Sequence, residues 1–115
     1  MLAKRKAVLG AGAHAALGLM HLQRAWMGLE GPDKDELAKA EQEYRTAVTS
    51  VDNPAPEDFY RLGETLTIEN KVPQALVAFT KASELSVGTP LKPIADQRLD
   101  ELRKKFPQVQ PAEKP

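Results

Sequence analysis

The sequence predicts an all-α protein made of antiparallel helix-turn-helix units, and three observations support this. Apolar residues recur at alternating steps of three and four, the spacing that places them on one face of a helix. Proline and glycine residues divide the chain into segments of helix length. A pattern of small and aromatic residues recurs in two of these segments. We therefore expect two helix pairs followed by one further helix.

Length and composition fit one folded domain. The chain has 115 residues, of which 42% are apolar and 28% charged, close to the averages of globular proteins. Its 16 basic and 16 acidic side chains give a net charge of zero, which disfavours binding to nucleic acid. The absence of cysteine excludes disulfides, thiolate zinc sites and a cysteine nucleophile.

The first predicted helix lies before Gly31-Pro32 and admits two interpretations. Lys4-Arg5-Lys6 followed by an apolar stretch has the outline of a signal peptide, so the first 20 or so residues are either removed on export or part of an ordered helix. No apolar run reaches the roughly 18 residues of a membrane span, so a transmembrane helix is not expected. The expected helical stripe consists of Val8, Gly12 or Ala11, Ala15, Leu19, Leu22, Trp26 and Leu29.

The next two helices have clear start and stop signals. The second is expected over 34–50, because the side chains of Asp33 and Glu36 can satisfy the unpaired amides of its first turn. The third is expected to begin near Pro56, since proline suits the first turn of a helix. It should end near Asn70, a residue type that tolerates left-handed backbone geometry.

The last part of the chain contains two further predicted helices. One runs from about Pro73 to Ser86 and is ended by Gly88, the residue type best suited to a C-terminal cap. The other is expected over 90–106. Residues 107–115 hold three prolines and little apolar surface, so we expect a disordered tail there.

Internal periodicity leads to a family resemblance. Within about 34 residues the chain reads Phe59-x2-Leu62-Gly63-x2-Leu66 and then Ala75-x3-Phe79-x2-Ala82. This resembles the tetratricopeptide repeat, in which an aromatic residue and Leu-Gly on one helix are followed by Ala-x3-Phe on the next. Small residues stand where two helices must approach closely, and large ones where the gap must be filled. The departures are Phe59 in place of tryptophan, Leu66 in place of tyrosine and Val87 in place of proline.

A degraded copy of the pattern occurs upstream, as Leu17-Gly18 and then Ala40-x3-Tyr44-x2-Ala47. Ala40 follows Gly18 by 22 positions, whereas Ala75 follows Gly63 by 12, so about ten extra residues must lengthen the first helix by roughly 15 Å or enter the loop after it.

The resemblance implies a right-handed α-solenoid whose domain covers 1–106. Its first repeat spans about 3–52, its second about 55–88, and a capping helix spans 90–106. Two units are few for such an array, so a homodimer through the N-terminal helix is a further hypothesis.

The resemblance also implies a site. The first helix of each unit lines a concave groove that binds a protein or peptide, and the alternative is that these positions are plain surface. Chaperone tails are not expected as ligands, because the Lys, Asn and Arg residues that grip them in this family are missing. The candidate groove residues are Glu57, Tyr60, Glu64 and Thr67 in the clearer unit and Leu19 and Gln23 in the degraded one.

No catalytic or cofactor site is expected. His14 and His21 lie seven residues apart without a third ligand at helical spacing, and no nucleophile-base or phosphate-loop pattern occurs. Trp26 is interpreted as a core residue rather than an exposed anchor. The sequence thus predicts a non-enzymatic protein-interaction module or assembly scaffold. The alternatives are an exported helical accessory protein and a helical enzyme or metal binder centred on the two histidines; the compartment stays open, with the cytoplasm slightly favoured.

Overall fold

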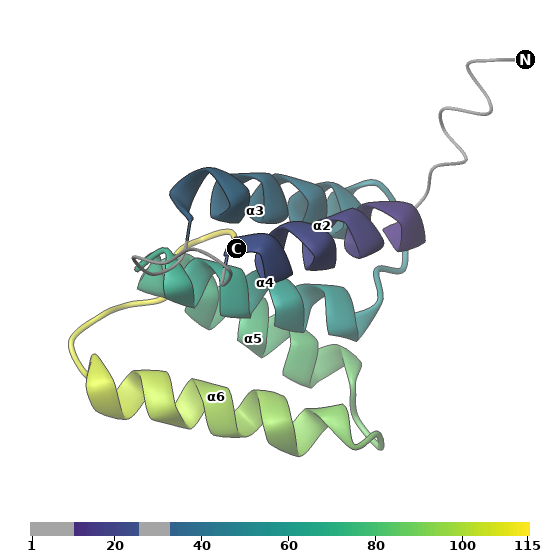
Figure 1. Ribbon diagram of the computed structural model, residues 1–115. Coiled ribbons are helices and arrows are strands. Elements are labelled where there is room, and N and C mark those ends of the chain that lie inside the picture. The colour runs from purple at the N-terminus through teal and green to yellow at the C-terminus, as the bar shows by residue number, and fades with distance from the viewer. Residues whose placement is uncertain (1–10, 26–32) are drawn as a thin grey trace, which may run out of the picture. The chain divides into compact units, whose positions relative to one another are not determined.

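The computed structural model describes residues 11–25 and 33–115. This part of the chain contains five helices and no strand. The fold is all-α, as predicted. The chain divides into two compact units, Met1–Pro54 and Ala55–Pro115, and the boundary falls between the two predicted repeats. The helices are α2 (Ala11–Ala25), α3 (Lys34–Thr49), α4 (Pro56–Ile68), α5 (Val72–Leu85) and α6 (Leu91–Lys105) (Figure 1).

The first unit contains the helix pair α2 and α3. A Cβ atom added to Gly18 of α2 would lie only 2.9 Å from the ring of Tyr44 on α3, so the missing side chain lets the ring pack against the backbone of α2. Tyr44 is buried, and the alanines on either side of it along α3 are fully buried as well. Among the described residues of this unit, those that form the core are Leu22, Ala25, Leu37, Ala40, Tyr44, Ala47 and Val48.

The buried face of α2 differs from the predicted stripe. Gly18, Leu22 and Ala25 are buried, whereas Leu19 is 37% exposed. The stripe is therefore turned by about one residue, because the close approach to Tyr44 centres the contact on Gly18. The predicted extensions of this helix, Trp26 included, fall on residues 1–10 and 26–32, outside the described part.

Helix α3 begins as the sequence predicts. Its N-cap is Asp33, whose Oδ1 accepts hydrogen bonds from the backbone amides of Asp35 (2.8 Å) and Glu36 (3.2 Å). The backbone amide of Asp33 also donates to the carbonyl of Ala25 at 2.9 Å, which ties the start of α3 to the end of α2.

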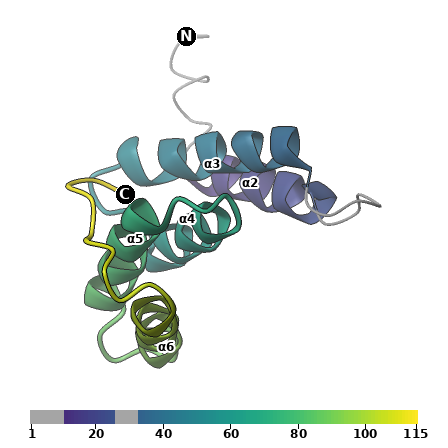
Figure 2. The same ribbon diagram turned by 90° about the vertical axis from the view of Figure 1, so that its left-hand side faces the viewer.

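The second unit contains α4, α5 and α6. Helix α4 packs on α5 around Gly63, where an added Cβ would lie 2.8 Å from the ring of Phe79. Helix α6 covers another side of α5, as the end-on view in Figure 2 shows, and buries Ala95, Leu99 and Leu102. Ala95 faces inward, and the neighbouring Ile94 is 45% exposed.

The two turns of this unit use the residues that the sequence singled out. Asn70 adopts a positive φ of 62° between α4 and α5, and the following amide, of Lys71, donates to the carbonyl of Leu66 at 2.8 Å. Gly88 adopts a φ of 83° between α5 and α6.

The C-terminal segment differs from the prediction of a disordered tail. After α6 the chain returns alongside α5 (Figure 2), and the backbone amide of Ala112 donates to the carbonyl of Pro73 at 3.0 Å. Phe106 is half-buried where this return begins. The prolines of this segment disfavour helix and sheet formation and favour extended backbone. A segment with extended backbone can still form one backbone hydrogen bond to the start of α5.

Candidate functional site

The candidate groove residues of the second unit share one face of α4. Glu57, Tyr60, Glu64 and Thr67 follow one another at steps of three and four, as the resemblance implies. Their exposure is unequal, because Glu57 is exposed, Glu64 and Thr67 are half-buried, and Tyr60 is buried.

Tyr60 is a junction between three helices. Its ring meets Phe79 of α5 edge to face, with the ring centroids 5.5 Å apart. Its hydroxyl accepts a hydrogen bond from Nε of Arg98 on α6 at 3.3 Å, and this bond raises the pKa of the Arg98 guanidinium. The side chain is only 8% exposed, so it offers little surface to a partner.

The polar residues of this face are held by their own helix. Arg61 Nη1 donates to Glu64 Oε1 at 2.8 Å, and Thr67 Oγ1 donates to the carbonyl of Gly63 at 2.8 Å. Next to Glu57, the side chain of Asp58 is buried, and burial raises the pKa of the Asp58 carboxyl, with a further rise from the negative charge of Glu57.

The candidates of the first unit lie on α2. Leu19 and Gln23 are one helical turn apart and both exposed, and the neighbouring Leu17 is 41% exposed. Leu17 and Leu19 are the exposed large apolar residues within the described part of this unit. The structure thus places Leu19 and Gln23 together on the exposed surface of α2 and the α4 candidates on a mostly polar face.

Two histidine-glutamate pairs connect α2 and α3. His14 Nδ1 lies 2.5 Å from Glu43 Oε2, and His21 Nδ1 lies 2.5 Å from Glu36 Oε2. All four side chains are partly buried, and the hydrogen bond from His21 lowers the pKa of Glu36. Sequence reasoning noted the two histidines but not their partners. The matching signal was present, because Glu36 and Glu43 are also seven residues apart.

These pairs do not form a metal site. Seven residues correspond to about 10 Å along a helix, so the two histidines are too far apart to share one ion. Among the described residues, no group of three or more His, Asp or Glu side chains is arranged to hold a metal. Nor is any helix in that part of the chain long and apolar enough to cross a membrane.

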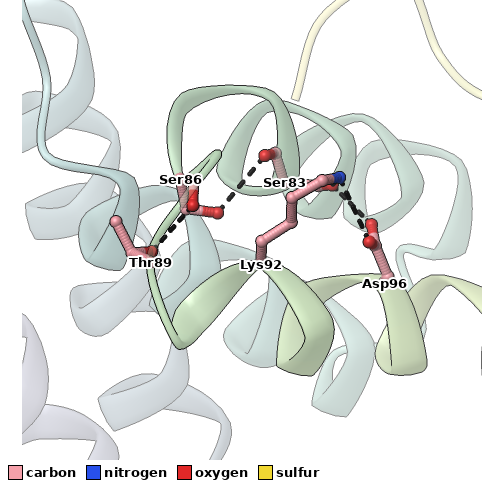
Figure 3. Close-up of polar contacts among 5 residues, drawn as sticks. All are labelled: Ser83, Ser86, Thr89, Lys92 and Asp96. Carbon is pink, nitrogen blue, oxygen red and sulfur yellow. Dashed lines mark hydrogen bonds and ion pairs between the residues drawn. The ribbon is translucent and has the colours of Figure 1, made fainter.

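A polar network that the sequence did not predict joins α5 to α6 (Figure 3). Ser83 Oγ donates to Asp96, and Lys92 Nζ donates to Ser83 Oγ at 3.0 Å and to Asp96 Oδ2 at 3.2 Å. Hydrogen bonds from Ser83 and then Lys92 lower the pKa of Asp96.

Serine beside lysine can form a nucleophile-base pair in hydrolases. Here the Ser83 hydroxyl is directed to a carboxylate and its residue is 6% exposed, so the network serves to connect the two helices.

Comparison of the chain with protein-family models, with curated proteins and with solved structures finds no match in any of the three.

Proposed function

We propose that the protein is a non-enzymatic interaction module of the tetratricopeptide class. The observation that carries the proposal is a contact that occurs once in each unit. In each pair, the ring of an aromatic residue on the second helix packs against a glycine on the first helix. Tyr44 packs against Gly18 in the first unit, and Phe79 packs against Gly63 in the second.

The alanines around each aromatic residue support the same proposal. In both units an alanine stands four positions before the ring and another three positions after it, and all four have no exposed surface. Small residues at these positions allow a second helix to approach closely, which is the packing that the repeat requires. The four are Ala40 and Ala47 in the first unit and Ala75 and Ala82 in the second.

The first unit has ten extra residues between its glycine and its aromatic ring, yet its two helices pack through the same contact as those of the second unit. Seven residues of α2 follow Gly18 and ten residues of α3 precede Tyr44, against five of α4 after Gly63 and seven of α5 before Phe79. Five of the ten surplus residues therefore lie within the described helices, and this extra helix length leaves the packing of the glycine on the aromatic ring unchanged.

The binding surface in this proposal is the exposed surface of α2. Leu19 and Gln23 lie four positions apart on one flank of α2, and Leu17, two positions before Leu19, is exposed on the opposite flank. An exposed helix of this kind can pack against an amphipathic helix of a partner. On α4, Tyr60 is withdrawn from the proposed surface because it is buried, and Glu57, Glu64 and Thr67 remain as polar candidates.

Affinity capture from the source organism tests this surface. Wild type is compared with Leu17→Ser/Leu19→Ser and with Leu85→Ser, a matched control on α5 whose leucine is 49% exposed. We expect the double variant to lose partners that wild type and control retain, with circular dichroism showing that all three are folded. Identical partners for all three proteins would refute α2 as the binding surface. Sedimentation velocity of the same proteins shows whether the partner is a second copy of the chain.

An exported accessory protein is the competing proposal, and α2 bears on it. Removal of a signal peptide after Ala15 or Ala16 would take away His14, the partner of Glu43, and would cut α2 just before Gly18. We therefore propose that α2 is retained. N-terminal sequencing of natively expressed protein decides, since a mature chain that begins after Ala15 or Ala16 would contradict it.

A further inference from the structure

The turn between α5 and α6 carries a combination of residues found nowhere else in the chain. Of all its serines and threonines, only Thr89 is followed directly by proline, and a lysine, Lys92, stands three positions after it. The four residues from Val87 to Pro90 are all exposed, and Val87 is 71% exposed.

The backbone of this turn leaves room for another protein. Gly88 has a φ of 83°, and apart from its two chain neighbours no atom of the described residues lies within 4 Å of the position that a Cβ would take there. Thr89 precedes Pro90, which disfavours helical backbone at Thr89. Pro90 itself is the N-cap of α6, with a φ of −63° and a ψ of −17°, and Lys92 lies in the first turn of that helix, so a kinase that binds its target in extended form must unwind this turn. The Thr89 hydroxyl is held by one local bond, because Oγ1 donates to the carbonyl of Ser86 at 2.8 Å (Figure 3).

We propose that Thr89 is a phosphorylation site for a proline-directed serine/threonine kinase, with Pro90 and Lys92 as the recognised neighbours. Oγ1 of Thr89 attacks the γ-phosphorus of ATP, and a new O–P bond forms. The bond from that phosphorus to the β,γ-bridging oxygen breaks, ADP leaves, and the hydroxyl proton passes to the catalytic base of the kinase.

The charges around Thr89 favour a phosphate group on its side chain. Helix α6 begins two residues later with no acidic residue in its first turn and no side-chain cap, so its start lacks the negative charge that favours a helix N-terminus. A phosphate of roughly two negative charges supplies it. The nearby ammonium of Lys92 is shared between Ser83 and Asp96, and the phosphate competes with them for it.

The test uses the purified full-length chain, ATP and a proline-directed kinase that prefers a basic residue three positions after its target. Intact-mass spectrometry is expected to show one added phosphate on wild type and on Thr89→Ser, and none on Thr89→Ala. Lys92→Ala should slow the reaction about tenfold, which corresponds to the loss of about one charge-assisted contact. Circular dichroism establishes that each variant is folded.

A synthetic peptide covering 83–96 serves as the accessibility control. Phosphorylation of the peptide but not of the folded chain would overturn the proposal, because the turn would then be closed to the kinase. Failure of both, or equal phosphorylation of wild type and Thr89→Ala, would overturn it as well. None of these outcomes depends on the interaction surface of α2.

Discussion

At the scale of single residues, three helical glycines have different surroundings. Gly18 and Gly63 each face an aromatic ring at a distance that leaves no room for a methyl group. At Gly12, by contrast, no other part of the described chain comes within 4 Å of the missing Cβ, its own helix backbone and chain neighbours apart. Glycine costs a helix about 1 kcal/mol relative to alanine in all three places. The packing of the ring offsets that cost at Gly18 and Gly63 only.

Gly63→Ala is therefore expected to destabilise the second unit. The new methyl group would meet Phe79, which is 1% exposed and has no space to move into. Overpacking of about 1–3 kcal/mol, less up to about 1 kcal/mol of gained helix propensity, gives a net loss of about 1–2 kcal/mol. Urea denaturation followed by circular dichroism measures the change.

Gly12→Ala is the matched control. It makes the same substitution in a helix but meets no neighbour, so it is expected to stabilise the protein by about 0.5–1 kcal/mol. Equal effects of the two substitutions would show that helix propensity, and not the contact with Phe79, decides the outcome.

The pairing of Glu36 with His21 predicts how stability depends on pH. The hydrogen bond holds the folded-state pKa of Glu36 below its ordinary value of 4.5. This contribution is present above the unfolded-state pKa and is lost as the pH falls through the folded-state pKa. We expect the first unit to lose stability below about pH 4.5, and Glu36→Gln to show a shallower decline. Thermal melts of both proteins between pH 3 and 7 test this, and parallel curves would contradict it.

At the scale of helices, the sequence predicts starts and ends better than faces. Asp33, Asn70 and Gly88 act through their own backbone neighbourhood, so their effect is readable locally. Which residues face the core depends on the helix that packs alongside. Leu85, at the end of α5, is 49% exposed, whereas Ala82 and Ser86 on either side of it are fully buried.

The cap of α3 gives a prediction for one helix. Asp33→Ala removes the acceptor for two amides and is expected to cost about 1 kcal/mol, whereas Asp33→Asn keeps an acceptor and should cost little. Urea denaturation of the two variants compares them. A similar loss in both would attribute the effect to the charge of Asp33 instead of its hydrogen bonds.

The candidate site shows the same division between local and distant information. The resemblance put Tyr60, Glu64 and Thr67 on one face of one helix, and they do share it. It did not reveal that Arg98, 38 residues further along the chain, binds the Tyr60 hydroxyl. The histidine-glutamate pairs were missed for a related reason, since their partners lie on two helices whose register a sequence pattern does not specify.

At the scale of the whole chain, the two units have separate cores. Ala55–Pro115 contains three helices, two turns with positive φ and the returning C-terminal segment, and domains of this size can fold alone. We expect this fragment to give a helical circular dichroism spectrum and a cooperative thermal transition. A fragment without a transition would mean that the second unit requires the rest of the chain to fold.

The contact between glycine and aromatic ring has a practical consequence for protein engineering. The same packing is reached with 25 residues between Gly18 and Tyr44 and with 15 between Gly63 and Phe79, so it tolerates connections of very different length. Closing a longer flexible loop adds only a fraction of a kcal/mol. A helix pair of this type can therefore accept an inserted epitope or a fused domain between its helices, provided that the glycine and the ring stay as they are.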